Sequence, residues 1–261
     1  MLSYRNSGQG MPVVLIHAFP FDSGMWREQI KFMQQKSRVI ALDLPGFGRS
    51  ACDGRQTIAA MAGEVAGQLE ALEVKAPVMI CGLSMGGYVA LEFFRQFPER
   101  VRALGLFSTR AGADTPEGRE KRLKTAEEIR SKGLTAFFQE LLPNLAGKTT
   151  RETRPSLLRV IEAMMASGSP EGVAQALVAM AHRSDLTGLL ETLRCPVLVL
   201  AGEEDTLIPC TESEAMHRQI PGSRFQRIEK AGHLVNLEQP EAFQKAFEDF
   251  WTVDVQGLPN P

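Results

Sequence analysis

The chain has 261 residues, of which 44% are hydrophobic, and a formal net charge of −2 from 29 basic and 31 acidic residues. This length is sufficient for one large domain with a buried core, and the balanced charge favours neither nucleic acid nor an anionic membrane as a partner. No apolar run approaches the roughly 20 residues that a membrane-spanning helix needs. The first residues lack the layout of a signal peptide, and the four cysteines form neither a Cys-x-x-Cys pair nor a metal-ligand cluster. We therefore expect a cytoplasmic protein without a bound metal.

Short apolar, β-branched runs alternate with helix-like segments along most of the chain. This alternation is typical of an α/β protein with a mostly parallel central sheet that is flanked by helices on both faces. The expected strands are residues 13–16, 39–42, 78–81, 103–107 and 197–201, with a weaker edge strand at 224–228. The expected helices are residues 25–35, 57–72, 86–96, 212–219 and 240–251. Residues 253–261, which are rich in glycine and proline, are predicted to form a loose tail.

The alternation stops between residues 110 and 193. This segment predicts amphipathic helices at residues 116–132, 134–142, 151–167 and 170–182, separated by Gly133, Pro143, Gly168 and Gly188. We interpret residues 1–109 and 194–261 as one core domain, and residues 110–193 as an all-helical cap inserted before the penultimate strand. The alternative is that the helices only cover one sheet face. A cap is favoured because ligands of open α/β sheets bind at the carboxyl ends of the strands, where such an insertion would lie.

The segment Gly82-Leu83-Ser84-Met85-Gly86 matches the pattern Gly-x-Ser-x-Gly. A buried strand runs into it and a helix-like segment follows, which is the setting that a nucleophile elbow requires. Glycines two residues before and after the serine permit a sharp, strained turn. The alternative is an ordinary glycine-rich turn with a helix-capping serine. The context favours Ser84 as a nucleophile.

A serine nucleophile needs a base, and the base needs an orienting acid. The chain has four histidines, at positions 17, 182, 217 and 233. Only His233 follows both the serine and a candidate acid, in the order nucleophile, acid, base that the serine elbow uses. The acid is expected directly after the strand at 197–201, where we favour Asp205 over its neighbours Glu203 and Glu204. Asp43 precedes the serine and is interpreted as a turn former.

An oxyanion that develops during acyl transfer needs two N–H donors. One is expected from the backbone of Met85, and the other from Phe19 in the loop after the first apolar strand. His17 is expected to brace that loop. Trp26 and Leu207 are predicted walls of the substrate pocket, although Trp26 is equally well explained as a packing residue of the first helix.

Five segments of the chain together resemble the α/β-hydrolase superfamily. They are residues 17–20 (His-Ala-Phe-Pro), 43–50, 82–87, 202–205 and the pair Gly232-His233, and they span nearly the whole chain in the order of that superfamily. The resemblance is strongest to its capped serine esterases and 3-oxoadipate enol-lactonase-like proteins. Ala18 stands where these proteins usually have glycine, and because the N-terminus is short we expect their first antiparallel strand to be absent.

The resemblance implies a serine esterase that acts on carboxylic esters of small molecules and needs no cofactor. Lactone, thioester or carbon–carbon-bond hydrolysis and perhydrolysis use the same three residues and stay open. Haloalkane dehalogenases and epoxide hydrolases are disfavoured because Ser84 stands where they have aspartate. A non-catalytic ligand-binding protein is an alternative of another class. Whether the chain is a monomer or a homodimer is left open.

Overall fold

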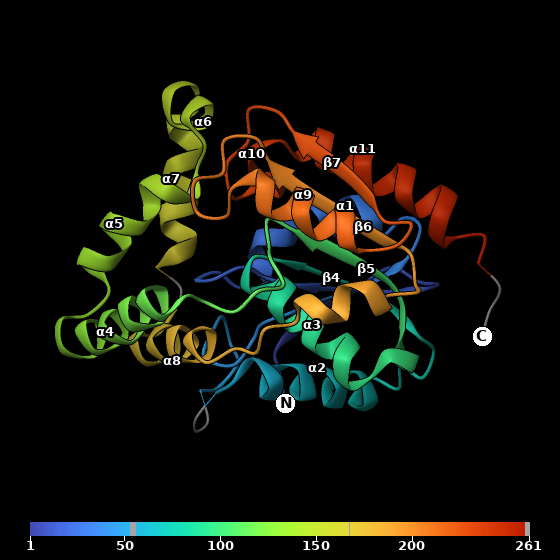
Figure 1. Ribbon diagram of the computed structural model, residues 1–261, viewed down its shortest axis with the longest axis horizontal. Helices are drawn as coiled ribbons and strands as arrows, with labels where there is room; N and C mark the ends of the chain where they lie inside the picture. Colours follow the sequence, from blue (N-terminus) through green and yellow to red (C-terminus); the bar gives the residue numbers. More distant parts are fainter. Residues whose placement is uncertain (53–55, 167, 259–261) are drawn as a thin grey trace.

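The computed structural model describes residues 1–52, 56–166 and 168–258, and its centre is a seven-stranded sheet (Figure 1). The strands lie in the order β1-β3-β2-β4-β5-β6-β7. β1 is antiparallel to β3, and all other neighbouring pairs are parallel, which confirms the predicted α/β class. The strands are β1 (Tyr4–Ser7), β2 (Pro12–Ile16), β3 (Arg38–Leu42), β4 (Val78–Leu83), β5 (Val101–Phe107), β6 (Val197–Gly202) and β7 (Arg224–Ile228).

The side chains of the central strands are buried on both faces of the sheet. Along β2, Val14 and Ile16 belong to one apolar cluster, whereas Val13 and Leu15 belong to a second cluster, as the two-residue period of a strand requires. Helices α2, α3 and α9 contribute to the first cluster, and α1 and α11 contribute to the second. The helices of the core are η1 (Ser23–Trp26), α1 (Arg27–Met33), α2 (Ile58–Ala71), α3 (Met85–Gln96), η2 (Pro98–Arg100), α9 (Cys210–Gln219), α10 (Val235–Glu238), α11 (Pro240–Phe250) and η4 (Trp251–Val255).

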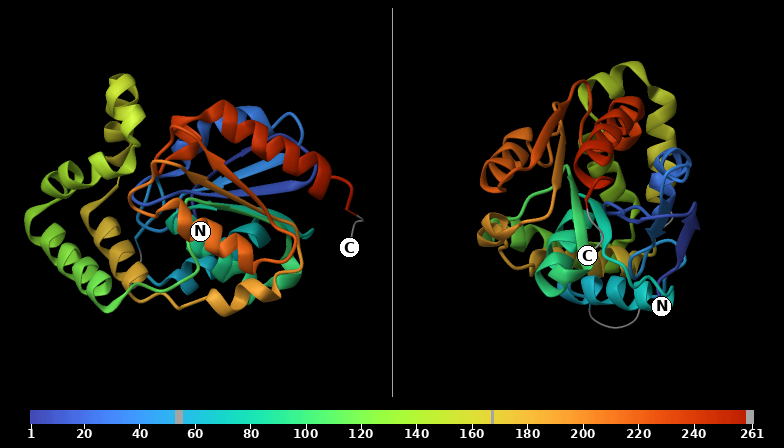
Figure 2. Two further views of the ribbon diagram at one scale, coloured as in Figure 1. Left: turned by 45° about the horizontal axis from the view of Figure 1, so that its top comes forward. Right: turned by 90° about the vertical axis from the view of Figure 1, so that its right-hand side faces the viewer.

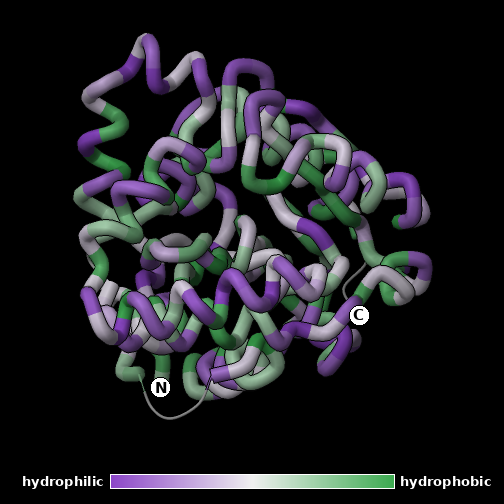
Figure 3. The backbone as a smooth tube through the Cα atoms, turned by 60° about the vertical axis from the view of Figure 1, so that its left-hand side comes forward, coloured by the Kyte–Doolittle hydropathy of each residue, from purple (hydrophilic) through white to green (hydrophobic). Residues whose placement is uncertain are grey.

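The segment between β5 and β6 is helical and, over its described residues, contains no strand. It forms α4 (Pro116–Lys132), α5 (Thr135–Leu145), α6 (Lys148–Thr153), α7 (Pro155–Met165), α8 (Pro170–Ala181) and η3 (Thr187–Thr192). Helices α4 to α8 lie together beside one end of the sheet in both Figure 1 and the left view of Figure 2. Hydrophobic and hydrophilic residues alternate along the backbone in Figure 3. In α7 the buried residues Ile161 and Met165 lie four positions apart, as on one side of an amphipathic helix.

Local sequence explains where two of these helices begin. The hydroxyl groups of Thr115 and Ser169 accept hydrogen bonds from the N–H groups of Gly118 and Gly172, and a proline follows each capping residue. This pairing of a side-chain cap with proline at the first helical position is a strong helix start. Helices α4 and α8, which both begin in this way, pack side by side.

Two sequence-based expectations at the chain ends are corrected. The prediction that the antiparallel first strand is absent is wrong, because β1 pairs with β3 over four residues. This strand is largely exposed and lacks an apolar run, so the sequence pattern did not reveal it. The tail is ordered at its start: Val253 and the buried Val255 lie in η4, a single π-helical turn. Residues 259–261 of the predicted tail lie outside the described residues.

Two boundaries within the helical segment also differ from prediction. The helix expected at residues 151–167 is divided, because Arg154 has non-helical dihedral angles and Pro155 starts a new helix. Ser167, at the end of that prediction, lies outside the described residues. Pro143, expected to end a helix, lies inside α5, which continues to Leu145. Among the described residues, none of the helices is both long and apolar enough to cross a lipid bilayer.

Candidate active site

Ser84 lies in the sharp turn between β4 and α3, and its side chain is half-buried. Its φ of 55° and ψ of −114° are unusual for a residue with a side chain. Neighbouring groups hold this strained backbone in place. The Ser84 N–H donates to the Phe107 carbonyl at 2.9 Å, and the Thr109 hydroxyl donates to the Ser84 carbonyl at 2.8 Å. Both partners come from the end of β5 and the residues directly after it, so this segment holds the turn in its strained conformation.

Gly82 and Gly86 are required by close backbone approaches on either side of Ser84. A Cβ on Gly82 would lie 2.0 Å from the Gly86 carbonyl oxygen. A Cβ on Gly86 would lie 2.2 Å from the carbonyl oxygen of Ile16. Both contacts are with backbone atoms that cannot rotate away. The two glycines thus let α3 start directly against the end of β2.

Asp205 and His233 meet at the carboxyl end of the sheet, from the loops that follow β6 and β7. The His233 Nδ1 lies 2.8 Å from the Asp205 Oδ2, and both residues are buried. The other carboxylate oxygen, Oδ1, accepts the N–H groups of Leu207 at 2.9 Å and Ile208 at 3.0 Å. The Asp205 carboxylate is therefore held in one orientation, and it engages Nδ1 of His233 and not Nε2.

The two neighbouring carboxylates have different surroundings. Glu203 is exposed. Glu204 turns toward the helical segment, where its Oε2 accepts the Thr149 N–H at 2.7 Å and its Oε1 accepts the Thr149 hydroxyl at 2.5 Å. Of the three carboxylates considered from the sequence, Asp205 is the one in contact with His233.

His17 is fully buried behind the loop that carries Phe19. Its Nε2 accepts the Leu44 N–H at 2.9 Å, and its Nδ1 lies 2.9 Å from the Ala18 carbonyl oxygen, to which it can donate. Burial lowers the pKa of His17 and outweighs the opposing effects of the Ala18 carbonyl and of Asp43. A neutral imidazole with this tautomer satisfies both contacts, and it ties the Phe19 loop to the end of β3.

A cavity of about 310 Å³ lies beside Ser84 and His233. Ser84 and His233 line it from the core, Phe19 and Leu207 come from adjoining loops, and Leu141 belongs to the walls formed by the helical segment. Its size is at the lower end of the range for small-molecule sites. Because Met85 is the first residue of α3, its N–H is among those that have no partner within the helix.

Trp26, predicted as a possible pocket wall, is placed elsewhere by the structure. It is fully buried, and its ring packs at centroid distances of 6.3 Å from Phe107 and 6.1 Å from Phe243. Of the two interpretations of Trp26 from the sequence, packing is correct. Adjacency in sequence to the Phe19 loop was misleading because η1 turns the tryptophan ring toward the opposite face of the sheet.

Sequence reasoning missed Glu238, at the end of α10. Its side chain is fully buried, and its Oε1 accepts the N–H groups of Gly232 at 2.9 Å and Leu234 at 3.1 Å, on either side of His233. Its Oε2 accepts the Gly147 N–H of the helical segment at 2.8 Å. One carboxylate thus holds both the His233 loop and the start of α6. A charged residue within the otherwise uncharged run 234–239 was the available sequence signal.

No cluster of three or more His, Cys, Asp or Glu side chains that could hold a metal ion occurs in the part of the chain that the structure describes. None of the four cysteines forms a disulfide. Burial raises the pKa of the Cys195 thiol to about 12, so it is inert as a nucleophile. The described lining of the cavity includes Ser84 but none of the cysteines.

Residues 11–240 match the family described as the alpha/beta hydrolase fold, and the chain belongs to this family. It is 30% identical to 3-oxoadipate enol-lactonase 2 of Acinetobacter baylyi, over 95% of this chain and 91% of that protein. It is 31% identical to a pimeloyl-[acyl-carrier protein] methyl ester esterase of Neisseria meningitidis, over 91% and 92%. A solved structure of a thermophilic esterase from Thermogutta terrifontis, with malate bound, superposes with a TM-score of 0.95 at 41% identity, over 98% of this chain and 94% of that one. These relatives confirm the predicted resemblance.

Proposed function

We propose that this protein is a serine hydrolase of small-molecule carboxylic esters, with Ser84 as nucleophile, His233 as base and Asp205 as the orienting acid. The observation that carries the proposal is the 2.8 Å contact between His233 and Asp205 beside a cavity that Ser84 also lines. The strained turn at Ser84 supports it, since such strain is retained where a function needs it.

In the proposed reaction, His233 Nε2 removes the Ser84 proton while Oγ bonds to the ester carbonyl carbon. The N–H groups of Phe19 and Met85 stabilise the oxyanion. The tetrahedral intermediate collapses, and the leaving alkoxide takes the proton from His233. Water, deprotonated by His233, then attacks the carbonyl carbon of the acyl-enzyme. The second tetrahedral intermediate collapses, Ser84 Oγ leaves and takes the proton back from His233, and the carboxylic acid is released. Asp205 keeps Nδ1 protonated throughout. Each step uses groups of this chain and water.

The helical segment has a place in this proposal as a lid. We assign residues 1–109 and 194–261 to the catalytic core and residues 110–193 to the cap. Support comes from the cavity, whose lining includes Leu141 and Leu177 of the helical segment as well as Ser84 and His233. Substrate choice in this arrangement depends on the helices, whereas the chemistry depends on the core.

Replacement of Ser84 by alanine tests the proposal. We expect kcat/KM for p-nitrophenyl valerate to fall by about 10⁴-fold or more, because the nucleophile is removed and the binding site is retained. Ser131→Ala, on the exposed side of α4, is the matched control and should retain full activity. Thermal unfolding of both variants checks the fold. If S84A keeps more than a tenth of the activity, Ser84 is not the nucleophile.

A lactone is the second candidate substrate, and the similarity to an enol-lactonase favours it. The same attack opens a lactone ring, and the alkoxide leaving group then stays attached to the acyl chain. Opening of δ-valerolactone, followed by acid release at constant pH, measures this activity. A protein that opens neither the lactone nor the p-nitrophenyl ester, and that does not react with a fluorophosphonate, would instead be a non-catalytic binding protein.

A further inference from the structure

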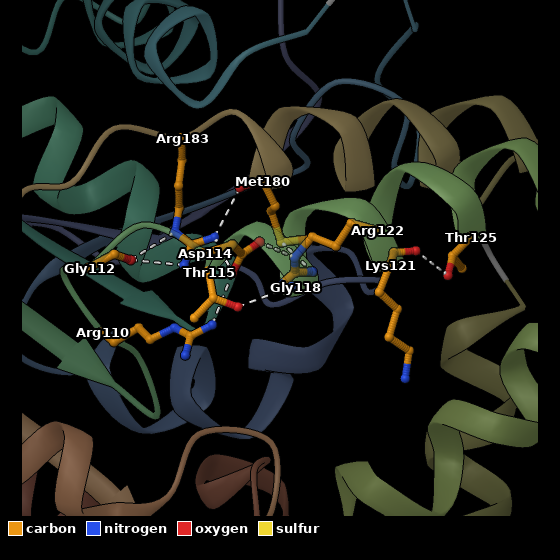
Figure 4. A network of polar contacts seen from close by, with 10 residues as sticks. All are labelled: Arg110, Gly112, Asp114, Thr115, Gly118, Lys121, Arg122, Thr125, Met180 and Arg183. Atoms are coloured by element: carbon orange, nitrogen blue, oxygen red, sulfur yellow. Dashed lines mark hydrogen bonds and ion pairs between the residues drawn. The ribbon is translucent and has the colours of Figure 1, made fainter.

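Three arginines surround Asp114 at the edge of the cavity, and we call these four residues the Asp114 cluster (Figure 4). The Asp114 Oδ1 lies 3.0 Å from Arg110 Nη2 and 2.8 Å from Arg183 Nη1, and the Oδ2 lies 2.6 Å from Arg122 Nε. Burial would raise the pKa of Asp114, but Arg122 and Arg183 outweigh it and lower this pKa. The carboxylate is therefore ionised, and three guanidinium groups share it.

Arg183 has a structural role within the cluster. Its side chain is only 4% exposed, and its guanidinium lies 4.3 Å from the centre of the Tyr88 ring. It also donates to the carbonyl oxygens of Gly112 and Met180. Together with the ion pair to Asp114, these contacts engage the N–H donors of Arg183 within the protein. Arg183 alone is therefore enough to neutralise the single negative charge of the cluster.

Arg110 and Arg122 differ from Arg183 because both line the cavity together with Ser84 and His233. Their side chains are 28% and 24% exposed. Arg122 uses Nε for Asp114 and Nη1 for the Met180 sulfur at 3.6 Å. Within the described residues its Nη2 has no further partner, and this nitrogen remains for a ligand.

The positive charge at this edge exceeds the negative charge. Three arginines against one aspartate leave a formal excess of two. Glu212 and Asp185 act on Arg110 and Arg183 from outside, but both are solvent-exposed and are absent from the described cavity lining. Water screens such charges strongly. Lys121 and Glu140 also line the cavity, and their opposite charges cancel because Lys121 Nζ lies 3.7 Å from Glu140 Oε1.

We propose that Arg110 and Arg122 bind a carboxylate of the substrate, so that the preferred ester or lactone is an anion with a free carboxylate beyond its reacting carbonyl. This inference rests on the proposed function of Ser84. Guanidinium groups suit a carboxylate because they donate paired N–H groups in one plane. Apolar side chains that line the same cavity, among them Leu177 and Met180, suit a short methylene chain that joins the carboxylate to the reacting carbonyl.

Two esters of equal chain length test the subsite. Mono-p-nitrophenyl glutarate carries a carboxylate where p-nitrophenyl valerate carries a methyl group. We expect the wild type to prefer the glutarate ester. In Arg122→Gln and Arg110→Gln, the ratio of the two kcat/KM values should fall about tenfold or more, mainly through KM. Arg130→Gln, which removes an arginine of the same helix that pairs with Glu171, should leave the ratio unchanged.

Binding to the S84A variant separates this proposal from the proposed function, because it requires no turnover. Calorimetry should detect glutarate binding to S84A and a loss of at least tenfold in affinity in S84A/R122Q. Hydrolysis of valerate without preference for glutarate, and without glutarate binding, would overturn the subsite but uphold the esterase. Glutarate binding by a protein that hydrolyses neither ester would overturn the esterase alone. Tighter binding of butyl phosphate than of glutarate would overturn the carboxylate assignment in favour of a phosphate.

Discussion

Glu238 is a buried carboxylate whose contacts allow a quantitative prediction. It accepts three backbone N–H groups, from Gly147 in the helical segment and from Gly232 and Leu234 beside His233. Glu238→Gln keeps the shape of the side chain but replaces one carboxylate oxygen by an NH₂ group. The amide carbonyl can retain the two donors beside His233. The NH₂ group then faces the Gly147 N–H, where a donor meets a donor.

The expected cost follows from that single mismatch. A buried donor that loses its partner costs about 1–3 kcal/mol, and a bond to a charged acceptor is at the upper part of that range. We therefore expect E238Q to lower the free energy of unfolding by about 2 kcal/mol, and Tm by roughly 4–8 °C for a chain of this size. Glu238→Ala orphans all three donors and should cost roughly 3–6 kcal/mol.

Urea denaturation and thermal unfolding measure these changes. Glu241→Gln is the matched control, because Glu241 is exposed in the first turn of α11, and its effect should stay within about 0.5 kcal/mol. The kcat/KM for p-nitrophenyl valerate should fall further in E238A than in E238Q, since only the alanine variant releases both bonds beside His233. If E238Q is as stable as E241Q, the carboxylate does not hold the loop and the helical segment together.

Two further predictions concern the supports of the Ser84 turn and of the Phe19 loop. Gly86→Ala should destabilise the protein by about 1–3 kcal/mol in urea denaturation, because the new Cβ would lie 2.2 Å from the Ile16 carbonyl oxygen; Gly63→Ala in α2, where no atom lies within 4 Å of the new Cβ, should be neutral or stabilising, and equal effects would contradict the steric argument. Burial lowers the pKa of His17 in the folded protein. Below about pH 6.5 the unfolded chain therefore binds more protons than the folded one, and the free energy of unfolding should decrease as the pH falls. His17→Gln should be less stable than the wild type at pH 7.5, but its free energy of unfolding should change less between pH 7.5 and 5.5. If the slope of the free energy of unfolding against pH is the same in both proteins, His17 does not cause the loss of stability at low pH.

The elements that the sequence predicted well depend on local patterns. All six expected strands are present, because continuous apolar, β-branched runs such as residues 197–201 suit strands that are buried on both faces. The antiparallel β1 escaped prediction because its exposed residues carry no such pattern and it is held by backbone bonds to β3. The break in the helix at Arg154 has a local cause, because Pro155 disfavours helical dihedral angles at the residue before it.

The candidate site shows the same division. The order of Ser84, Asp205 and His233 and their positions after strands were readable from the chain, because parallel strands bring their carboxyl ends to one edge of a sheet. Sequence spacing alone did not decide which of Glu203, Glu204 and Asp205 contacts His233. The fold turns Glu204 toward Thr149 and Asp205 toward His233.

The sequence by itself determined the strand–helix alternation, the helical character of the segment between β5 and β6 and the glycines around Ser84, since each depends on neighbours within a few residues. Only the tertiary structure decided that Trp26 packs in the core, that Glu238 joins the His233 loop to Gly147, and that Arg110 and Arg122 share the cavity with Ser84. These outcomes depend on distances between residues far apart in the chain. A chain's local pattern specifies which face of an element is apolar, but the packing of the elements specifies which side chains meet.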